Sequence, residues 1–304
     1  MHRLKSVNSN LMRELNRTLV IEQIRTAKKI TRSEISKKTG LTMSTLTTIV
    51  NGLIEEGLVS EVGERASRGG RRPILLQFNG DFGCVVGVKI ETDHIYFCRS
   101  NLEAKLERTE VIEYSSSYSN TQINDLLITG IKTVMEDRCC EQRFFGIGIA
   151  ASGLINRETR TVVYSPIVGW DNYSFASISE EFQVPVLLDN DANVFSLGQI
   201  WIRGEASFQN FIGVIIGAGI GAGIVIDGQL YRGEFGGAGE LGHTVIQQEG
   251  SACYCGQRGC LEMYASDAFI INEAQRMAAM QVPTAMEKLE KITPRAVAQA
   301  AEDG

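Results

Sequence analysis

The sequence has no apolar run long enough to cross a membrane and no stretch typical of a secretory signal. Its apolar stretches all fall short of the eighteen or more residues that a membrane helix needs. The first twenty residues, MHRLKSVNSNLMRELNRTLV, lack the apolar segment and the small-residue cleavage site of a signal peptide. We therefore expect a cytoplasmic protein with no membrane partner.

Histidine and cysteine are scarce and unevenly placed. The chain has three histidines and seven cysteines in 304 residues. An odd, unevenly spaced set of cysteines in a long chain argues against a secreted disulfide framework. The composition, 43% apolar and 22% charged, is typical of a globular protein. At this length two or three domains are expected.

The net charge of -6 conceals a difference between the two ends of the chain. Residues 1–80 contain 14 Lys and Arg against 7 Asp and Glu, a net charge of +7, which leaves -13 for the remainder. A basic block beside an acidic body suggests that the basic block meets a polyanion. Charge alone fits a solvated surface equally well.

The pattern of the first eighty residues predicts a winged helix-turn-helix. Residues 11–26 carry apolar side chains at helical spacing, which predicts a helix. The segment TRSEISKKTG begins at Thr31, and Thr31 and Glu34 have the spacing of a capping box. Gly40 suits the turn after this helix, and Thr42 is the expected first cap of the next one. Two short helices joined by a tight turn form a helix-turn-helix. LVSEV and PILLQF then predict two strands.

Two groups of side chains in this block suit contacts with DNA. The second helix presents short hydroxyl side chains opposite its apolar face, and such side chains reach base edges and phosphates in the major groove. The arginine-rich loop between the two strands resembles a wing that contacts phosphate or the minor groove. The predicted DNA contacts are Ser44, Thr45, Thr47, Thr48, Arg65, Arg68, Arg71 and Arg72. The alternative is a small helical bundle with a charged hairpin.

Four potential metal ligands lie close together late in the chain. His243, Cys253, Cys255 and Cys260 have the spacing H-x9-C-x-C-x4-C, which fits a closed tetrahedral zinc site. The order differs from the C-x-x-C redox pattern, and ACYCGQRGCLE is too polar and glycine-rich for simple packing. Four protein ligands leave no position for an activated water. We therefore predict a structural Zn²⁺ rather than a catalytic one.

From Cys84 onward, the order of predicted strands and helices indicates an α/β body with two related lobes. The segments GIGIAASGLI, SPIVGW, LLDNDANVFSLGQIWIRG, GAGIGAGIVIDGQLYRGEFGGAGELGH and CYCGQRGCLEMYAS cover much of 145–266. In this combination and order they resemble the ROK family (repressor, open reading frame, kinase). The preceding winged helix resembles the family's repressor branch. The resemblance implies an actin-like ATPase, ribonuclease H-like fold.

The resemblance also implies a division of the chain. We expect a winged helix-turn-helix at 1–80, a first lobe at 81–190 and a second lobe with the zinc motif at 191–304. The family normally continues with further helices and a glycine-rich segment. A chain that stops at AVAQAAEDG is therefore expected to have a second lobe truncated at its C-terminus.

A sugar site follows from the same resemblance. The family positions that contact the sugar match Gly153, Asn190, Asp191, Glu240, His243 and Glu262. Carboxylates accept bonds from two hydroxyls each, and Asn and His side chains orient others. The family's zinc motif likewise matches all four predicted ligands. In one departure, SPIVGW has Ile167 where the family usually has asparagine. A hydroxyl contact is lost there, and we expect a smaller or differently substituted ligand.

The phosphate-binding loop argues against kinase activity. Kinases of the family carry a D-x-G-x-T loop that cradles phosphates. In VKIETDH, the aspartate, glycine and threonine are replaced by Lys89, Glu91 and Asp93. Two new carboxylates would repel a polyphosphate. In the family's kinases the position of Asp191 is the general base, so Asp191 is expected here to be a vestigial base that accepts a sugar hydroxyl.

The sequence as a whole predicts a non-catalytic, sugar-responsive transcriptional regulator, most simply a repressor of carbohydrate-utilisation genes. The expected partners are a double-stranded DNA operator, a small sugar or sugar derivative, and a second copy in a homodimer or a dimer of dimers. The alternative is an ATP-dependent sugar kinase with a DNA-binding appendage. Three further questions stay open: whether the sugar is inducer or corepressor, whether a phosphotransferase protein is the partner, and whether the chain binds DNA constitutively.

Overall fold

The computed structural model describes residues 9–64, 73–115, 117–138, 142–203, 208–234, 236–280 and 292–302. The chain has an α/β fold with two compact units. The smaller unit contains residues 1–85, 99–108 and 137–145, and the larger unit contains residues 86–98, 109–136 and 146–304. None of the described helices is both long and apolar enough to cross a membrane.

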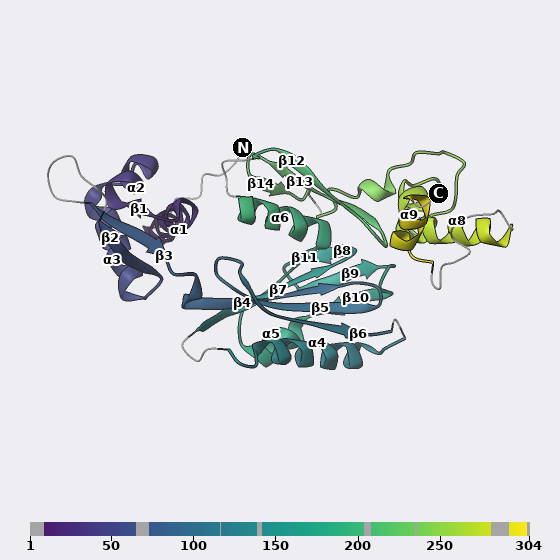
Figure 1. Cartoon of the computed structure of the whole chain (residues 1–304), viewed down its shortest axis with the longest axis horizontal. Coiled ribbons are helices and arrows are strands. Elements are labelled where there is room, and N and C mark those ends of the chain that lie inside the picture. The colour runs from purple at the N-terminus through teal and green to yellow at the C-terminus, as the bar shows by residue number, and fades with distance from the viewer. Residues whose placement is uncertain are drawn as a thin grey trace. The chain divides into compact units, whose positions relative to one another are not determined.

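Three helices and a three-stranded sheet form the N-terminal part of the smaller unit (Figure 1). The helices are α1 (Ser9–Ala27), α2 (Arg32–Thr39) and α3 (Met43–Glu55). The strands are β1 (Ile30–Thr31), β2 (Val59–Glu64) and β3 (Ile74–Phe78), which pair antiparallel in the order β1-β3-β2. The short 3-10 helix η1 (Gly80–Phe82) follows. The helices and strands predicted for this segment are confirmed.

Capping residues in the sequence set the ends of α2 and α3. The Thr31 hydroxyl accepts from the Glu34 amide at 3.3 Å, and the Glu34 carboxylate accepts from the Thr31 amide at 3.0 Å, which is the predicted capping box. Gly40 ends α2 in the left-handed conformation, with φ of 72°. The Thr42 hydroxyl caps α3 by accepting from the Thr45 amide at 3.3 Å. Local sequence therefore determines the turn between the two helices.

The core of the smaller unit buries one apolar face of each helix. Its fully buried side chains include Val20, Ile24, Ile35, Leu46, Val50, Leu53 and Leu76. Burial of such a side chain contributes about 1.5–3 kcal/mol. Phe82 and Leu102, which follow the N-terminal sheet in the chain, pack against the same core. The core therefore extends beyond residues 1–80, for which the sequence predicts a winged helix-turn-helix.

A five-stranded sheet has the order β11-β7-β4-β5-β6. Its strands are β4 (Gly83–Ile90), β5 (His94–Asn101), β6 (Leu106–Glu113), β7 (Arg143–Ala151) and β11 (Val186–Asn190). Strands β7 and β11 are parallel, with Asn190 opposite Ala151, so their carboxyl ends lie side by side. In the larger unit, α4 (Asn120–Met135) and α5 (Ala176–Phe182) contact each other and lie on one face of the sheet (Figure 1).

Two smaller antiparallel sheets also lie in the larger unit. The first has the order β10-β9-β8, with β8 (Leu154–Asn156), β9 (Thr161–Ser165) and β10 (Trp170–Ser174). The second has the order β12-β13-β14, with β12 (Phe211–Ile216), β13 (Ile220–Ile226) and β14 (Gln229–Tyr231). The helical segments that accompany them are α6 (Asp191–Arg203), η2 (Leu241–His243), α7 (Glu262–Ala265), α8 (Asp267–Ala279) and α9 (Pro294–Glu302).

Helix α6 packs closely on β12 and β13 because two glycines leave room for it. A Cβ atom at Gly213 or Gly223 would lie 2.3 Å from the Ser196 hydroxyl, which donates to the Gly223 carbonyl at 3.2 Å. The close packing fixes α6, whose first residue reaches the candidate site.

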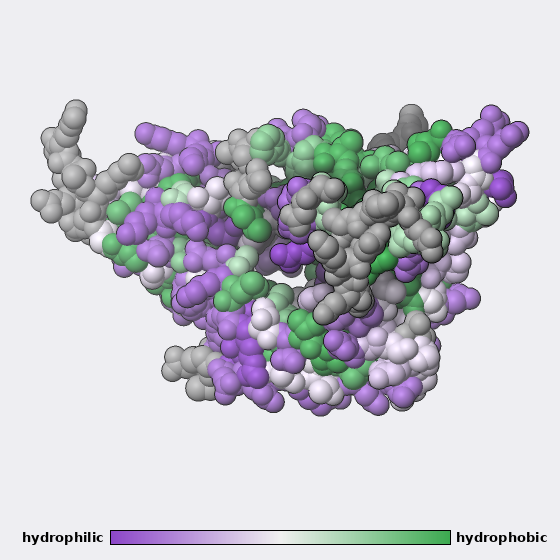
Figure 2. All heavy atoms as spheres, turned by 45° about the vertical axis from the view of Figure 1, so that its right-hand side comes forward, coloured by the Kyte–Doolittle hydropathy of each residue, from purple (hydrophilic) through white to green (hydrophobic). Residues whose placement is uncertain are grey.

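On β12, Ile212 and Ile216 are 62% and 64% exposed, and apolar side chains gather over this part of the surface (Figure 2).

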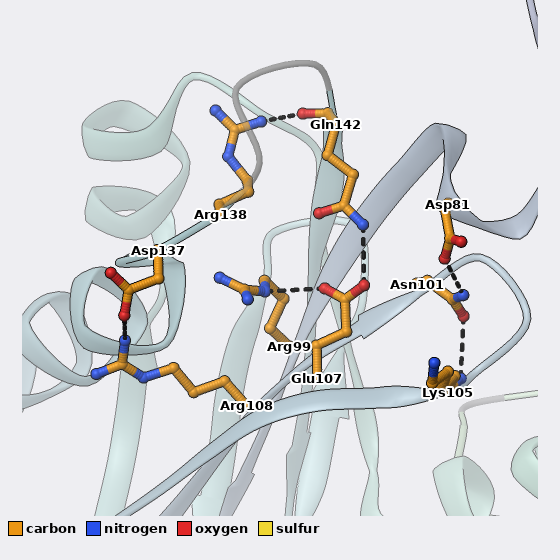
Figure 3. Close-up of polar contacts among 9 residues, drawn as sticks. All are labelled: Asp81, Arg99, Asn101, Lys105, Glu107, Arg108, Asp137, Arg138 and Gln142. Atoms are coloured by element: carbon orange, nitrogen blue, oxygen red, sulfur yellow. Dashed lines mark hydrogen bonds and ion pairs between the residues drawn. The ribbon is translucent and has the colours of Figure 1, made fainter.

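Polar contacts in the smaller unit hold the turn between β5 and β6 (Figure 3). Asn101 is 4% exposed, donates to Asp81 Oδ1 at 2.7 Å and accepts from the amides of Glu103 and Lys105 at 3.0 Å each. The Lys28 ammonium, just after α1, pairs with Glu103 at 3.5 Å. The turn is thereby bound both to η1 and to the end of α1.

A partly buried ion pair lies beside this turn in the same unit (Figure 3). Arg99 Nε donates to Glu107 Oε2 at 3.0 Å, and Gln142 Nε2 donates to Glu107 Oε1 at 2.9 Å. Arg99 and Gln142 are each 7% exposed, and Arg138 donates to the Gln142 carbonyl. Both oxygens of the carboxylate are therefore satisfied, as burial of a charge requires.

We expect Asn101→Ala to destabilise the smaller unit. The substitution removes three part-buried hydrogen bonds, two from the backbone amides of Glu103 and Lys105 and one to Asp81, which costs about 1–3 kcal/mol in the free energy of unfolding. Urea unfolding measures the difference. Lys105→Ala is the matched control, because Lys105 contacts Asn101 through its backbone amide and carbonyl, which the substitution keeps. Equal stability of the two variants would contradict the role given to the Asn101 side chain.

Candidate functional site

The larger unit contains a cavity of about 1020 Å³. Its walls come from the carboxyl ends of β4, β7, β9 and β11, from the start of β13, and from the segment around η2 and α7. All six residues predicted to contact a sugar line this cavity, namely Gly153, Asn190, Asp191, Glu240, His243 and Glu262. The fold therefore brings together residues that lie more than a hundred positions apart in the chain.

The end of β11 and the start of α6 carry two of these residues. Asn190 Nδ2 donates to the Gly153 carbonyl at 3.2 Å, and Asn190 Oδ1 accepts from the Ala192 amide at 3.0 Å. Asp191 is the first residue of α6, and its Oδ1 also accepts from the Ala192 amide, at 2.9 Å. Burial raises the pKa of Asp191, while the Ala192 amide and the Lys89 charge act in the opposite direction. Both side chains are thus oriented by the helix N-terminus.

An ion pair behind this strand end was missed in the sequence. Arg232 donates to Asp189 Oδ2 from Nε at 3.0 Å and from Nη2 at 2.8 Å. The other oxygen, Oδ1, accepts from Asn193 Nδ2 at 3.0 Å and from the Asn190 amide at 2.9 Å. Arg157 Nε lies 3.3 Å from Asp189 Oδ2. Arg232 precedes the glycine-rich loop that leads to η2, so the pair ties this loop to β11.

Glu262 is held by the protein through both carboxylate oxygens. Oε2 accepts from the Ile220 amide at 2.6 Å, and Oε1 accepts from the Tyr254 hydroxyl. The residue is 4% exposed. Desolvation raises the pKa of the neighbouring Glu240, the His243 ring opposes this rise, and the Glu262 carboxylate adds to it. The Tyr254 contact was also missed, because no local pattern relates this tyrosine to Glu262.

The four predicted metal ligands converge at one edge of the cavity. Their ligand atoms all lie within 4.8 Å of one another. His243 Nδ1 lies 3.5 Å from Cys253 Sγ, and Cys255 Sγ lies 3.6 Å from Cys260 Sγ. A tetrahedral zinc with bonds of about 2.3 Å to sulfur has ligand-to-ligand edges of roughly 3.7 Å. The donor set and its spacing therefore fit a metal ion such as zinc.

A glycine in the cysteine-rich loop permits this convergence. Gly259 has φ of 75°, and a Cβ there would lie 1.6 Å from the Gln247 carbonyl oxygen. The Gln247 and Ile246 amides donate to the Gly259 carbonyl at 3.2 and 2.8 Å. No other residue type fits this conformation and this close approach without strain. The glycine brings the chain back so that Cys260 can approach Cys255.

The predicted DNA contacts on α3 are exposed. Ser44, Thr45, Thr47 and Thr48 all face solvent, opposite the buried Leu46 and Val50. The hydroxyls of Thr47 and Thr48 donate to the carbonyls one turn earlier, at 2.7 and 3.1 Å, and keep their acceptor capacity. The four predicted arginine contacts, Arg65, Arg68, Arg71 and Arg72, lie outside the described residues.

The residues expected from the sequence to replace the family's phosphate-binding motif also reach the cavity. Lys89, Glu91 and Asp93 all line it, and the Lys89 ammonium forms an ion pair with the Glu91 carboxylate. The Tyr114 hydroxyl donates to the Glu91 carbonyl at 2.5 Å, which holds the backbone after β4. This part of the cavity lining therefore presents a lysine paired with one carboxylate, and a second carboxylate.

The sequence and the structure are both similar to those of known proteins. The model of the ROK family matches residues 85–304. The chain is 35% identical over 302 residues to the xylose repressor of Caldicellulosiruptor bescii, with 98% of this chain and 76% of that protein covered. The structure resembles a ROK family transcriptional regulator described as a homologue of the Escherichia coli MLC protein, with a TM-score of 0.81, 25% identity, and 96% and 74% of the two chains covered.

A kinase of known structure is also similar. The ROK family glucokinase of Streptomyces griseus, solved in complex with glucose and AMPPNP, has a TM-score of 0.64 and 26% identity, with 73% of this chain and 72% of that chain covered. The similarity therefore extends to both regulators and enzymes that share this α/β body. The family match spans well over half of the chain, and the repressor similarity spans nearly all of it. The chain belongs to the ROK family.

Proposed function

We propose that this protein is a sugar-responsive transcriptional repressor in which a sugar bound in the cavity changes the affinity for operator DNA. The observation that carries the proposal is that all six residues predicted to contact a sugar line one cavity. The chain is similar over 98% of its length to a xylose repressor, so xylose is the first effector to test. The Asp191 carboxylate then accepts a hydrogen bond from a sugar hydroxyl and performs no catalysis.

The N-terminal helices and strands are proposed to bind DNA as a winged helix-turn-helix. The exposed hydroxyls of α3 would face the major groove, and the arginines at 65, 68, 71 and 72 would contact phosphate or the minor groove. A homodimer would place two such units on the two halves of a pseudo-palindromic operator. We propose the domain division at 1–80, 81–190 and 191–304 on the same grounds.

The metal cluster is proposed to hold a structural Zn²⁺ through His243, Cys253, Cys255 and Cys260. The ion would supply a cross-link between η2 and the segment just before α7. The cross-linked segments carry residues of the cavity wall: the loop contains Tyr254, and η2 lies directly after Glu240. The loop would thereby brace the wall of the sugar site.

A sugar kinase is the second candidate, because a ROK glucokinase shares the fold. The Lys89–Glu91 pair and Asp93 disfavour it, since carboxylates at this end of the cavity repel a polyphosphate. An ADP-release assay with ATP and a panel of hexoses, N-acetylhexosamines and xylose tests it. Turnover that Asp191→Asn abolishes would favour the kinase.

Operator binding in the presence of sugars tests the main proposal. We expect xylose to change the affinity for operator DNA about 5- to 150-fold, which corresponds to a coupling free energy of about 1–3 kcal/mol. Fluorescence anisotropy with labelled operator measures the change. Mannitol at the same concentration is the control for nonspecific solute effects. An operator affinity that no sugar in the panel alters would overturn the proposal.

A further inference from the structure

We infer that Ile167 and Tyr254 determine the sugar specificity of the cavity and select a pentose over a hexose. The inference rests on the proposed function, because it names the class of sugar for the same site. Both side chains line the cavity; Tyr254 donates to the Glu262 carboxylate, and Ile167 lies next to Gly219, as Glu262 does. Together they reduce the number of hydrogen-bonding groups that this wall presents to a ligand.

The Tyr254 hydroxyl uses one of the two oxygens of the Glu262 carboxylate. It donates to Glu262 Oε1, while the Ile220 amide donates to Oε2 at 2.6 Å. Each oxygen of this buried carboxylate therefore already has a partner in the protein. The Glu262 carboxylate consequently has less capacity for ligand hydroxyls than a free carboxylate, which accepts several hydrogen bonds.

Two further contacts hold the Tyr254 ring at the edge of the cavity. The ring packs edge-on against His243, with the ring centroids 5.2 Å apart and an interplanar angle of 87°. Tyr254 also lies between two of the predicted metal ligands in the chain, Cys253 and Cys255. The phenol is therefore part of the wall and reduces the space beside Glu262.

Ile167 adds an apolar side chain to the wall near Glu262. Its Cδ1 atom and Glu262 Oε2 both lie against Gly219, at 2.6 and 2.8 Å from the position where a Cβ of Gly219 would stand. Isoleucine has neither a donor nor an acceptor, whereas the asparagine expected at this position from the family resemblance has both. A ligand hydroxyl placed here would lose water without gaining a hydrogen bond, and a CH₂ group would not.

This wall therefore suits a sugar ring that has no polar substituent on one side. A pentose in its six-membered ring form has a ring CH₂ group where a hexose carries a hydroxymethyl group. The pentose presents only carbon and hydrogen to Ile167, and it needs no volume beside the Tyr254 ring. A hexose must place an extra carbon and an unpaired hydroxyl in the same region.

Titration calorimetry of the full chain with xylose and with glucose tests the inference. We expect the wild type to bind xylose at least tenfold tighter, within the roughly 10- to 200-fold that a pocket gains against one extra carbon group. Ile167→Asn should shift the xylose-to-glucose ratio towards glucose by about tenfold. Tyr254→Phe keeps the ring, frees Glu262 Oε1 and should also improve glucose binding. Leu187→Asn, at a 69% exposed position of β11 outside the cavity, is the matched control.

The outcomes separate this inference from the proposed function. If the wild type binds no sugar, both fail. If it binds glucose more tightly than xylose, or if xylose binds but neither variant changes the ratio, only the inference fails. Circular dichroism checks that each variant is folded. Ile167→Thr, which also supplies a hydroxyl, replaces the asparagine variant if that variant does not fold, and the same change in the ratio is required of it.

Discussion

Cys253→Ser is expected to remove the proposed Zn²⁺ and the proposed sugar response together. The serine hydroxyl is a poor zinc ligand, and the loss of one of four ligands opens a site that needs all four. Without the cross-link, the loop that carries Tyr254 no longer has a fixed position against His243 and Glu262. We expect the zinc content to fall from about one ion per chain to near zero and the effect of xylose on operator binding to disappear.

Metal content by elemental analysis and operator binding by anisotropy measure the two losses. Operator binding without sugar should persist, because the core of α1, α2 and α3 contains no residue of the metal cluster. Cys98→Ser is the control, since Cys98 lies on β5 and outside the cluster. A variant that loses the metal and keeps its full sugar response would contradict the link between cluster and cavity.

Arg232→Met is expected to give the second large effect. It leaves the Asp189 carboxylate, whose side chain is 11% exposed, without its two-bond partner. Breaking a pair of this burial costs up to about 3 kcal/mol, because the carboxylate then keeps only the half-exposed Arg157 as a cationic partner. The backbone amide of Asn190 and the side chain of Asn193 both depend on Asp189, so Asn190 and the following Asp191 should lose their positions. We expect the affinity for the sugar and the free energy of unfolding to decrease together.

A double-mutant cycle separates the charge from the packing of the arginine. In the Arg232→Met, Asp189→Asn double variant the buried charge is absent, and we expect part of the lost free energy of unfolding to return. Arg157→Met is the matched control: this side chain is 49% exposed, and surface pairs contribute about 0–1 kcal/mol. Equal losses for Arg157→Met and Arg232→Met would show that the Arg232–Asp189 pair does not position the strand end.

Local patterns in the sequence were sufficient for the elements whose causes are local. The capping box at Thr31 and Glu34, the left-handed Gly40 and the cap at Thr42 each act within a few residues, and the structure confirms all of them. The spacing of one histidine and three cysteines likewise identified a cluster whose ligand atoms lie within 4.8 Å. The six predicted sugar-site residues line one cavity, although their roles stay predictions.

Only the tertiary structure decided which partners those residues have. Asp189 and Arg232 are separated by 43 positions, and their pairing depends on how β11 and the end of β14 approach each other. The Tyr254 hydroxyl reaches Glu262 because the cysteine-rich loop folds back on itself.

By itself, then, the sequence determined the α/β class and the helix caps, and it identified a cluster of four residues that could hold a metal and the residues of one candidate site. Phe82 and Leu102 entered the N-terminal core, and Ile167 came to lie beside Glu262, only through the packing of distant elements. The physical reason is that hydrogen bonds within a turn depend on neighbouring residues. The free energy of a buried contact depends instead on which surfaces the whole chain brings together.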